Sequence, residues 1–506
     1  MSYVLGLDLG TSSLKGLLLN KAGKVVAQAT HEYPLETPQS GYSEQSPAHW
    51  LIAAQKVIEN ITEQVPMIKE ELEGISFSGQ MHSLVLLDAA GTPLRNAILW
   101  NDVRTTAQCK EIMAKAGNEL LAITKNVALE GFTLPKILWV QEQEPDVWQS
   151  AKKFLLPKDY LAYWLTGQYH MDYSDAAGTL LLDVEKKVWS KKISALFDIP
   201  SELYPELIAS DGCRGVVREN LKNEFGFIND VKVFGGGADN ACAALGAGIV
   251  DESVGMVSIG TSGVFLSYEE TAQKDYQGKL HIFNHVAPNA YYSMGVTLAA
   301  GDSLSWFKDT FAPDSSFSDL LIDVRTVNVG ADGLLFTPYI VGERTPYVDG
   351  EIRGSFIGCD TQHELKHFVR AVLEGITFSL KDSQRITEVI AGKKFDKIIS
   401  VGGGAKSADW LQIQADIFNA KIVILKAEQG PGLGAAMLAA MGLGWFDSYE
   451  QCIAAFVEYK DSYSPIPENV KNYQEIYEIY RKVYRQTNEI CHELLAQQSK
   501  KQKVFV

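Results

Sequence analysis

The sequence lacks the usual marks of a membrane, secreted or P-loop protein. None of its 506 residues lies in an apolar run long enough to span a bilayer, and the N-terminus has no cationic, apolar signal layout. No G-x-x-x-x-G-K-[ST] motif occurs, which excludes a P-loop nucleotide site. The six cysteines are scattered, without a C-x-x-C pair or histidines at zinc spacing. We therefore expect reduced thiols, a cytoplasmic location and no membrane partner.

Positive charge is also scarce. Lysine and arginine number 46 against 62 aspartates and glutamates, which gives a formal net charge of −16. Because phosphate contacts of nucleic acids require a basic surface, this balance disfavours a nucleic-acid partner. The hydrophobic fraction of 46% and the charged fraction of 21% are average for a globular protein. The length exceeds one ordinary core and allows about three domains.

A strand followed by a Gly-Thr-Ser turn occurs twice, in residues 3–16 and again in residues 256–266. The glycines, Gly10 and Gly260, permit a sharp turn. Asp8 lies near the end of the first strand, where a carboxylate can hold hydrated Mg²⁺ against a phosphate. One such loop alone is more often an ordinary β-turn. Two copies predict a duplicated domain that grips a nucleoside triphosphate between its halves.

Strands alternate with helices along both halves, which predicts an α/β architecture. The strongest helical patterns span residues 47–63, 301–310, 364–383 and 468–497. Strands are expected at 3–9, 13–19, 74–78 and 398–401, with a β-hairpin formed by 84–87 and 97–100. No low-complexity linker separates the halves, so the repeat sets the boundary. We predict domains at 1–247 and 248–506.

The segment 233–246 ends a strand in three glycines and then places Asp239 at an expected helix N-terminus. The glycines permit close backbone approach by a ligand. Asp239 is equally consistent with an N-cap and with a base whose pKa is lowered by the helix, ready to accept a proton from a hydroxyl. Further along, residues 430–435 loosely fit a G-x-G-x-x-A dinucleotide fingerprint. Because Pro431 occupies the turn, we favour small residues that pack helix 434–440 against a neighbour.

The paired turns resemble the phosphate clamp shared by sugar kinases, actin and the 70-kDa heat-shock chaperones. That resemblance implies two ribonuclease H-like domains with a nucleotide cleft between them. From Asp8 through Gly434 the sequence is similar to the FGGY carbohydrate kinase family, and residues 131–143 match its central signature. The motifs most similar to the branch that phosphorylates D-xylulose are Gly79-Gln80-Met81-His82, Leu99-Trp100-Asn101-Asp102-x-Arg104, residues 155–160, residues 174–179 and residues 342–346.

The resemblance also implies the roles of individual residues. Asp239 would be the catalytic base, Asp8 would help to hold Mg²⁺, and the substrate contacts would be Gln80, Met81, His82 and Asn240. The residues expected to bind ATP are Thr11, Ser12, Lys15, Gly260, Thr261, Gly301, Gly403, Gly404 and Ala405. Arg344 is interpreted as an ion-pair partner of Glu343 rather than as a catalytic group.

These features predict an ATP-dependent ketopentose kinase that forms D-xylulose 5-phosphate, acts in xylose catabolism and is a candidate homodimer. The runner-up is another FGGY sugar kinase, because gluconokinases share the Met-His pair; glycerol kinases carry an Arg-Glu pair there, which is absent. A different class is a non-catalytic nucleotide-switch protein. A chaperone would need a peptide-binding module and a repressor a DNA-binding extension, and we expect neither.

Overall fold

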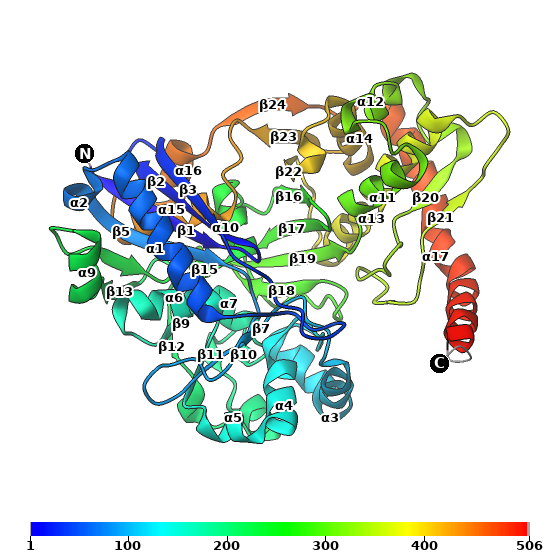
Figure 1. The fold of residues 1–506 in the computed structure, drawn as a ribbon. Coiled ribbons are helices and arrows are strands. Elements are labelled where there is room, and N and C mark those ends of the chain that lie inside the picture. The colour runs from blue at the N-terminus through cyan, green and yellow to red at the C-terminus, as the bar shows by residue number, and fades with distance from the viewer. Residues whose placement is uncertain (1, 503–506) are drawn as a thin grey trace.

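The computed structural model describes residues 2–502, which form two mixed α/β halves side by side (Figure 1). Each half contains a seven-stranded sheet. In the first sheet the order is β13-β14-β5-β1-β2-β3, with β15 paired to β5. Its strands are β1 (Tyr3–Leu9), β2 (Ser13–Asn20), β3 (Val25–Glu32), β5 (Leu72–Gly79), β13 (Cys213–Val216), β14 (Lys232–Phe234) and β15 (Gly237–Ala238).

The second sheet repeats the plan of the first, in the order β18-β19-β17-β16-β22-β23-β24. In each sheet a central strand pairs antiparallel with the strand that follows the Gly-Thr-Ser turn and parallel with a later strand. The strands are β16 (Val254–Ile259), β17 (Gly263–Glu269), β18 (His281–Asn284), β19 (Tyr291–Thr297), β22 (Lys397–Gly402), β23 (Lys421–Leu425) and β24 (Tyr459–Tyr463). The predicted duplication is thus a structural one.

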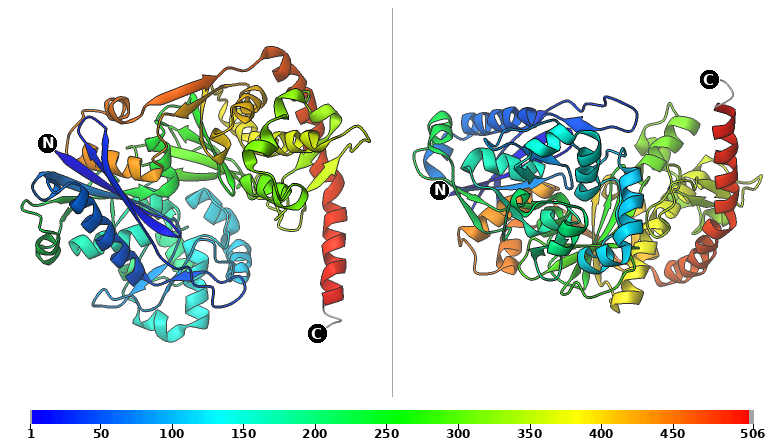
Figure 2. Two further views of the ribbon diagram at one scale, coloured as in Figure 1. Left: turned by 45° about the horizontal axis from the view of Figure 1, so that its top comes forward. Right: turned by 90° about the horizontal axis from the view of Figure 1, so that it is seen from below.

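Helices cover both sheets, and the four strong helical patterns are all present. They correspond to α1 (Pro47–Gln64), α11 (Gly301–Phe311), α13 (Leu365–Ala391) and α17 (Pro467–Gln502). The last part of α17 projects away from the second half (Figures 1 and 2). The other helices used below are α4 (Thr133–Gln143), α6 (Pro157–Thr166), α7 (Tyr173–Ala177), α10 (Asp239–Gly246), α12 (Phe317–Leu321), α14 (Ala408–Phe418) and α15 (Pro431–Gly442). No helix among residues 2–502 is long and apolar enough to cross a membrane.

One helix from the second half of the chain returns to the first sheet. α15 packs on β1 and β5 and against α10. A Cβ on Gly434 would lie 2.0 Å from the carbonyl oxygen of Cys242, and a Cβ on Gly6 would lie 2.2 Å from that of Gly432. Only glycine allows such close backbone approach, so the interpretation of residues 430–435 as a packing turn is confirmed.

The predicted hairpin of residues 84–87 and 97–100 is present in irregular form, because antiparallel bridges join Leu84 to Ile98 and Leu87 to Pro93. β6 (Val85–Leu87) pairs antiparallel with β8 (Lys153–Leu155), and β7 (Ala97–Ile98) pairs with β4 (Glu44–Gln45). Across the turn, the N–H of Leu94 donates to the carbonyl oxygen of Leu86 at 2.9 Å, and the N–H of Asp88 donates to that of Thr92 at 3.0 Å. Strand partners that are distant in sequence therefore add to the local pairing.

Candidate active site

Two cavities meet at the turn between β16 and β17. The smaller, of about 400 Å³, is lined from the first half by Met81, His82 and Asp239, and from the second half by Arg344. The larger, of about 720 Å³, lies within the second half. Gly260, in the turn between β16 and β17, lines both cavities. Molecules that fill the two cavities would therefore face each other at this turn.

Asp239 lies where β15 passes into α10, at the first residue of the helix rather than at its N-cap, which is Ala238. Its Oδ1 accepts hydrogen bonds from the backbone N–H of Asn240 at 2.7 Å and from Asn240 Nδ2 at 3.0 Å. The N-cap interpretation is wrong, because Ala238 is the N-cap and the only backbone amide among the described residues that donates to the Asp239 carboxylate is that of the adjacent Asn240. The carboxylate instead lines the small cavity.

The expected lowering of the pKa of Asp239 by the helix is also wrong. Burial and the nearby charge of Asp8 raise the pKa of Asp239 to about 7, against the opposing hydrogen bonds from Asn240. Burial likewise raises the pKa of Asp8 to about 6, although Lys15 opposes the shift. Desolvation thus outweighs the helix N-terminus, and two carboxylates share one electrostatic environment.

His82 presents one defined ring nitrogen to the cavity. It follows β5 in a loop with φ of 69°, and its Nδ1 lies 2.7 Å from the carbonyl oxygen of Gly178. Burial lowers the pKa of His82 to about 3, so the ring is neutral at neutral pH. Because a carbonyl only accepts, Nδ1 carries the proton and Nε2 is a hydrogen-bond acceptor. Met81, beside it, contacts Asn240 Nδ2 through its sulfur at 3.8 Å.

Gln80 lies behind the cavity rather than in its lining. The side chain is 2% exposed, and its Nε2 donates to Gln45 Oε1 at 3.2 Å and to the carbonyl oxygen of Gly10 at 3.4 Å. The amide therefore joins the loop that carries His82 to the first Gly-Thr-Ser turn. Gln80 therefore supports the cavity lining without being part of it.

The second Gly-Thr-Ser turn is built against the start of α11. The carbonyl oxygen of Gly260 accepts from the N–H of Gly301 at 2.8 Å, and that of Thr261 accepts from the N–H of Asp302 at 3.1 Å. A Cβ on Gly301 would lie 2.4 Å from the oxygen of Gly260. The start of α11 and the turn are thus bonded to each other in the lining of the large cavity.

The first turn is arranged differently. Thr11 Oγ1 accepts a hydrogen bond from Trp100 Nε1 at 2.9 Å, and Trp100 lines the small cavity. Lys15 pairs in register with Asp8 across β1 and β2. Thr11, Ser12 and Lys15 line neither the small nor the large cavity. They therefore lie outside the point at Gly260 where the two cavities meet.

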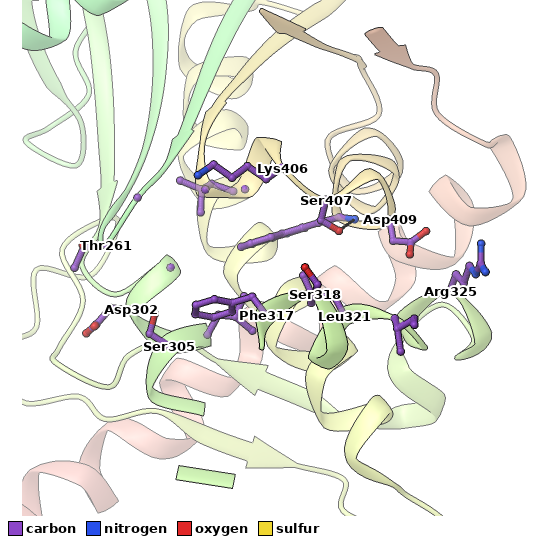
Figure 3. Close-up of a pocket in the computed structure, with 18 residues that line it drawn as sticks. Thr261, Asp302, Ser305, Phe317, Ser318, Leu321, Arg325, Lys406, Ser407 and Asp409 are labelled. Atoms are coloured by element: carbon purple, nitrogen blue, oxygen red, sulfur yellow. Dashed lines mark hydrogen bonds between the residues drawn. The ribbon is translucent and has the colours of Figure 1, made fainter. Parts of the chain in front are cut away.

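The large cavity is a slot between two helical walls (Figure 3). Phe317, Ser318 and Leu321 of α12 form one wall, and Lys406 and Ser407 precede α14 on the other. The floor includes three of the predicted glycines, Gly301, Gly403 and Gly404. Ala405 packs into the neighbouring hydrophobic core instead. A slot with apolar and aromatic walls and a polar end fits a flat base with phosphates.

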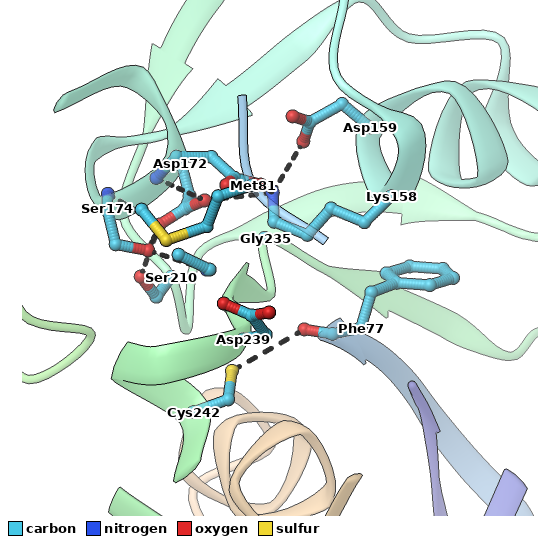
Figure 4. A network of polar contacts seen from close by, with 12 residues as sticks. Phe77, Met81, Lys158, Asp159, Asp172, Ser174, Ser210, Gly235, Asp239 and Cys242 are labelled. Carbon is cyan, nitrogen blue, oxygen red and sulfur yellow. Dashed lines mark hydrogen bonds and ion pairs between the residues drawn. The ribbon is translucent and has the colours of Figure 1, made fainter. Parts of the chain in front are cut away.

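A buried charge network supports the turn that carries Asp239 (Figure 4). Lys158 forms ion pairs with Asp172 at 2.8 Å and with Asp159 at 2.7 Å. Asp172 accepts from Ser174 Oγ at 2.5 Å, and Ser174 Oγ in turn accepts from the N–H of Ala238 at 2.9 Å. The network therefore fixes the residue immediately before the proposed base.

Comparisons with known proteins agree with this geometry. Residues 3–246 match the N-terminal domain of the FGGY family of carbohydrate kinases, and residues 255–443 match its C-terminal domain. The chain belongs to the FGGY family of carbohydrate kinases.

Similar proteins cover this FGGY kinase almost end to end. A xylulose kinase of Lactococcus lactis subsp. lactis (strain IL1403) is 57% identical over 98% of this chain and 99% of its own length. A crystal structure of a xyloylose kinase from Brucella ovis has a TM-score of 0.92 at 35% identity, over 96% of this chain and 100% of that one. A gluconate kinase from Lactobacillus acidophilus has a TM-score of 0.91 at 28% identity, over 96% and 98%. The predicted family and the predicted two-domain kinase fold are confirmed.

Sequence reasoning missed several residues that line the small cavity of this FGGY kinase. The missed lining residues include Trp100, Glu130, Phe132, His281 and Arg344. Trp100, Phe132 and Arg344 lie inside motifs that carried the family resemblance, so membership of those motifs could have identified them. His281 lies in no such motif, and no sequence signal pointed to it.

The expected ion pair between Arg344 and Glu343 is absent from the described residues. Glu343 Oε1 instead accepts the backbone N–H of Arg344 at 2.8 Å, so this carboxylate orders the loop and does not hold the guanidinium.

Proposed function

We propose that this protein transfers the γ-phosphoryl group of ATP to O5 of D-xylulose and releases D-xylulose 5-phosphate and ADP, as a step of xylose catabolism. The observation that carries the proposal is the junction of two cavities at Gly260, with Asp239 in the smaller. The names of its relatives, xylulose kinases at 57% and 50% identity, support the choice of sugar. The family supports ATP as the phosphoryl donor.

In the proposed reaction the sugar lies in the small cavity with its C5 hydroxyl beside Asp239. The O5–H proton passes to the Asp239 carboxylate while O5 forms a bond to the γ-phosphorus. The bond from that phosphorus to the bridging oxygen breaks, and ADP leaves. Because phosphoryl transfer depends mainly on positioning and charge neutralisation, the turn at Gly260 and Thr261 would align the γ-phosphate. Closure of the two halves would exclude water as a competing acceptor.

A divalent cation fits beside Asp8. No cluster of three or more acidic, histidine or cysteine ligands exists among residues 2–502. Asp8 and Asp239, however, are close enough for the charge of Asp8 to raise the pKa of Asp239. Mg²⁺ commonly uses one or two carboxylates, with water and substrate phosphates as the remaining ligands. We assign Asp8 as the residue that would hold Mg²⁺, which would neutralise charge on the phosphates.

The remaining assignments complete the proposal. Residues 1–247 form the sugar-binding domain and residues 248–506 the nucleotide-binding domain, with α15 returning to the first sheet. Met81, His82 and Asn240 contact the sugar, and Gln80 supports them. Thr11, Ser12 and Lys15 reach the phosphates from the first turn when the halves close. The enzyme acts in the cytoplasm and forms a homodimer.

An ATP-coupled assay over D-xylulose, L-ribulose, gluconate, glycerol and L-fuculose tests the proposal. We expect D-xylulose to have the highest kcat/KM and to yield one ADP per pentulose 5-phosphate. A preference for gluconate would overturn the sugar assignment and leave the kinase intact. Turnover with none of these sugars, in a protein that still binds ATP, would favour a non-catalytic nucleotide switch.

A further inference from the structure

The small cavity has hydrogen-bond acceptors whose direction the structure fixes. His281 repeats the arrangement of His82. Asn126 donates through Nδ2 to the carbonyl oxygens of Thr124, at 2.9 Å, and of Ile282, at 2.8 Å. Its Oδ1 must therefore face His281 Nδ1, which lies 2.8 Å away and carries the proton. The pKa of His281 is lowered to about 3 by burial, so its Nε2 is an acceptor, like that of His82.

Donors are scarcer in the same cavity. Asn240 Nδ2 donates to Asp239, and Trp100 Nε1 donates to Thr11. The amide of Asn101 belongs to an exposed residue, and the lining serines belong to β16 and the turn at Gly260. Arg344 is the single cation among the described residues that line the cavity.

Arg344 is held by its backbone and left unpaired at its guanidinium. The carboxylate of Glu343 accepts the N–H groups of Arg344, at 2.8 Å, and of Leu298, at 3.1 Å. The next residue, Thr345, exchanges hydrogen bonds with the backbone of Val296 at 3.0 and 3.1 Å. Among the described residues the guanidinium itself has no hydrogen bond and no ion pair within 4.0 Å. The Arg344 backbone is thus fixed, while its guanidinium, which can only donate hydrogen bonds, is available to a ligand atom that accepts them.

Arg344 lies on the side of the cavity formed by β18 and β19, because Thr345 bonds to Val296 of β19 and His281 pairs in register with Met294 of the same strand. The charge that raises the pKa of Asp239 comes from Asp8. The charge of Arg344, by contrast, helps to lower the pKa of both His82 and His281. A sugar with its C5 hydroxyl at Asp239 would therefore extend its carbonyl end toward Arg344 and the two histidines.

We propose that Arg344 recognises the C2 carbonyl of the substrate and so selects a ketose over its reduced alditols. The inference rests on the proposed function. Every hydroxyl of an open-chain ketopentose can donate to the histidine and carboxylate acceptors, whereas its carbonyl oxygen can only accept. The guanidinium is the unpaired donor that matches it. Reduction of C2 replaces that acceptor with a tetrahedral hydroxyl that no longer lies in the plane of the guanidinium fork.

The test compares D-xylulose with xylitol and D-arabinitol, the two alditols formed by reduction at C2. In Arg344→Met we expect kcat/KM for D-xylulose to fall by about 10–100-fold, the range for a lost charge-assisted hydrogen bond. The alditols should lose less than about 3-fold, and KM for ATP should stay within about 2-fold, because neither depends on a carbonyl contact. Calorimetry without nucleotide should show weaker D-xylulose binding, and Arg344→Lys should recover part of the preference.

Arg353→Met is the matched control. The Arg353 guanidinium donates to the carbonyl oxygens of Gly350, at 2.8 Å, and Ile352, at 2.7 Å, within the loop that follows Arg344. We expect it to leave the ketose-to-alditol ratio unchanged.

Equal losses for ketose and alditols in Arg344→Met, or an unchanged ratio, would overturn the inference while the proposed function stands. A wild-type protein that does not phosphorylate D-xylulose would overturn the proposed function, and the inference with it.

Discussion

The proposed mechanism depends on two carboxylates whose pKa values are shifted upward. Desolvation is the larger cause for both Asp8 and Asp239, and the charge of Asp8 adds to the shift at Asp239. A base with a pKa of about 7 is well matched to proton transfer near neutral pH, because it is both available and basic enough. In the proposed mechanism, burial of the Asp239 carboxylate therefore favours proton transfer, although it does not favour the stability of the fold.

The raised pKa predicts the pH dependence. Asp239 must be ionised to accept a proton, so kcat/KM for D-xylulose should rise with pH and level off above about 7. Asp8→Asn removes a negative charge and should move this rise to lower pH, even as it lowers the rate. Profiles between about pH 5 and 9 at fixed free Mg²⁺ measure both effects. A profile of wild-type activity that is flat from pH 5.5 to 8 would contradict the assignment of Asp239.

At this scale the sequence predicted part of the site. Asp239 and Gly260 directly follow strand ends, and His82 lies three residues after one; such local patterns are visible without a fold. Arg344 and His281 line the cavity because loops and strands of the second half pack against the first. No local pattern reports that packing. The direction of the pKa shift at Asp239 was mispredicted because the helix N-terminus is readable in sequence and the burial is not.

Among the elements, the β16–β17 turn and α11 are held together by a close backbone contact. Gly301 leaves no room for a side chain, since a Cβ would lie 2.4 Å from the Gly260 oxygen. Gly301→Ala must therefore displace the helix N-terminus from the turn. We expect KM for ATP to rise by about 10-fold or more and KM for D-xylulose to change by less than about 3-fold, because Gly301 lines the larger cavity and not the smaller one.

A matched glycine separates this effect from a general loss of flexibility. Gly350→Ala adds the same methyl group where no atom lies within 4 Å, so its kinetics should be those of the wild type. Steady-state kinetics with each substrate varied in turn provides the comparison. Unchanged ATP kinetics in a folded Gly301→Ala protein would argue against phosphate binding at this junction.

The elements themselves were largely predictable, including an irregular hairpin at residues 84–87 and 97–100. A turn does form there, with the N–H of Gly91 donating to the carbonyl oxygen of Asp88 at 3.1 Å. The flanking segments also pair with β8 and β4, which are distant in sequence. A local hairpin pattern gives no information about such partners.

For the whole molecule, the duplicated sheets explain why the site lies where it does. The two Gly-Thr-Ser turns follow corresponding strands, β1 and β16, so the related sheets bring one turn from each half toward the same junction. The repeated strand and Gly-Thr-Ser turn could be recognised in the sequence. The packing of α15 on the first sheet could not be predicted, because its small residues indicate close packing but do not identify the partner.

The same buried carboxylates should lower the stability of the protein as pH rises. An acid whose pKa is about 7 when folded and 3.8 in its model state binds more protons in the folded protein between those values. Stability is therefore lost as pH rises through that window and stays low above it. Asp239→Asn should raise Tm relative to the wild type at pH 8, by about 2–4 °C for each kcal/mol recovered.

At pH 4 the two proteins should melt at similar temperatures, since Asp239 is then protonated in the folded state. Differential scanning calorimetry at both pH values makes the measurement. An Asp239→Asn protein less stable than the wild type at pH 8 would show that the carboxylate stabilises the fold through its hydrogen bonds with Asn240.

The central claim is that the two halves bring ATP and a ketose together at Gly260 so that Asp239 can accept the proton from O5. The most direct test is to measure turnover of D-xylulose by the wild type and by Asp239→Asn, with ATP and sugar binding determined separately by calorimetry. The account predicts that kcat falls by about 10²–10⁴-fold while both dissociation constants stay within about 3-fold. Near-normal turnover by a folded Asp239→Asn protein would contradict it.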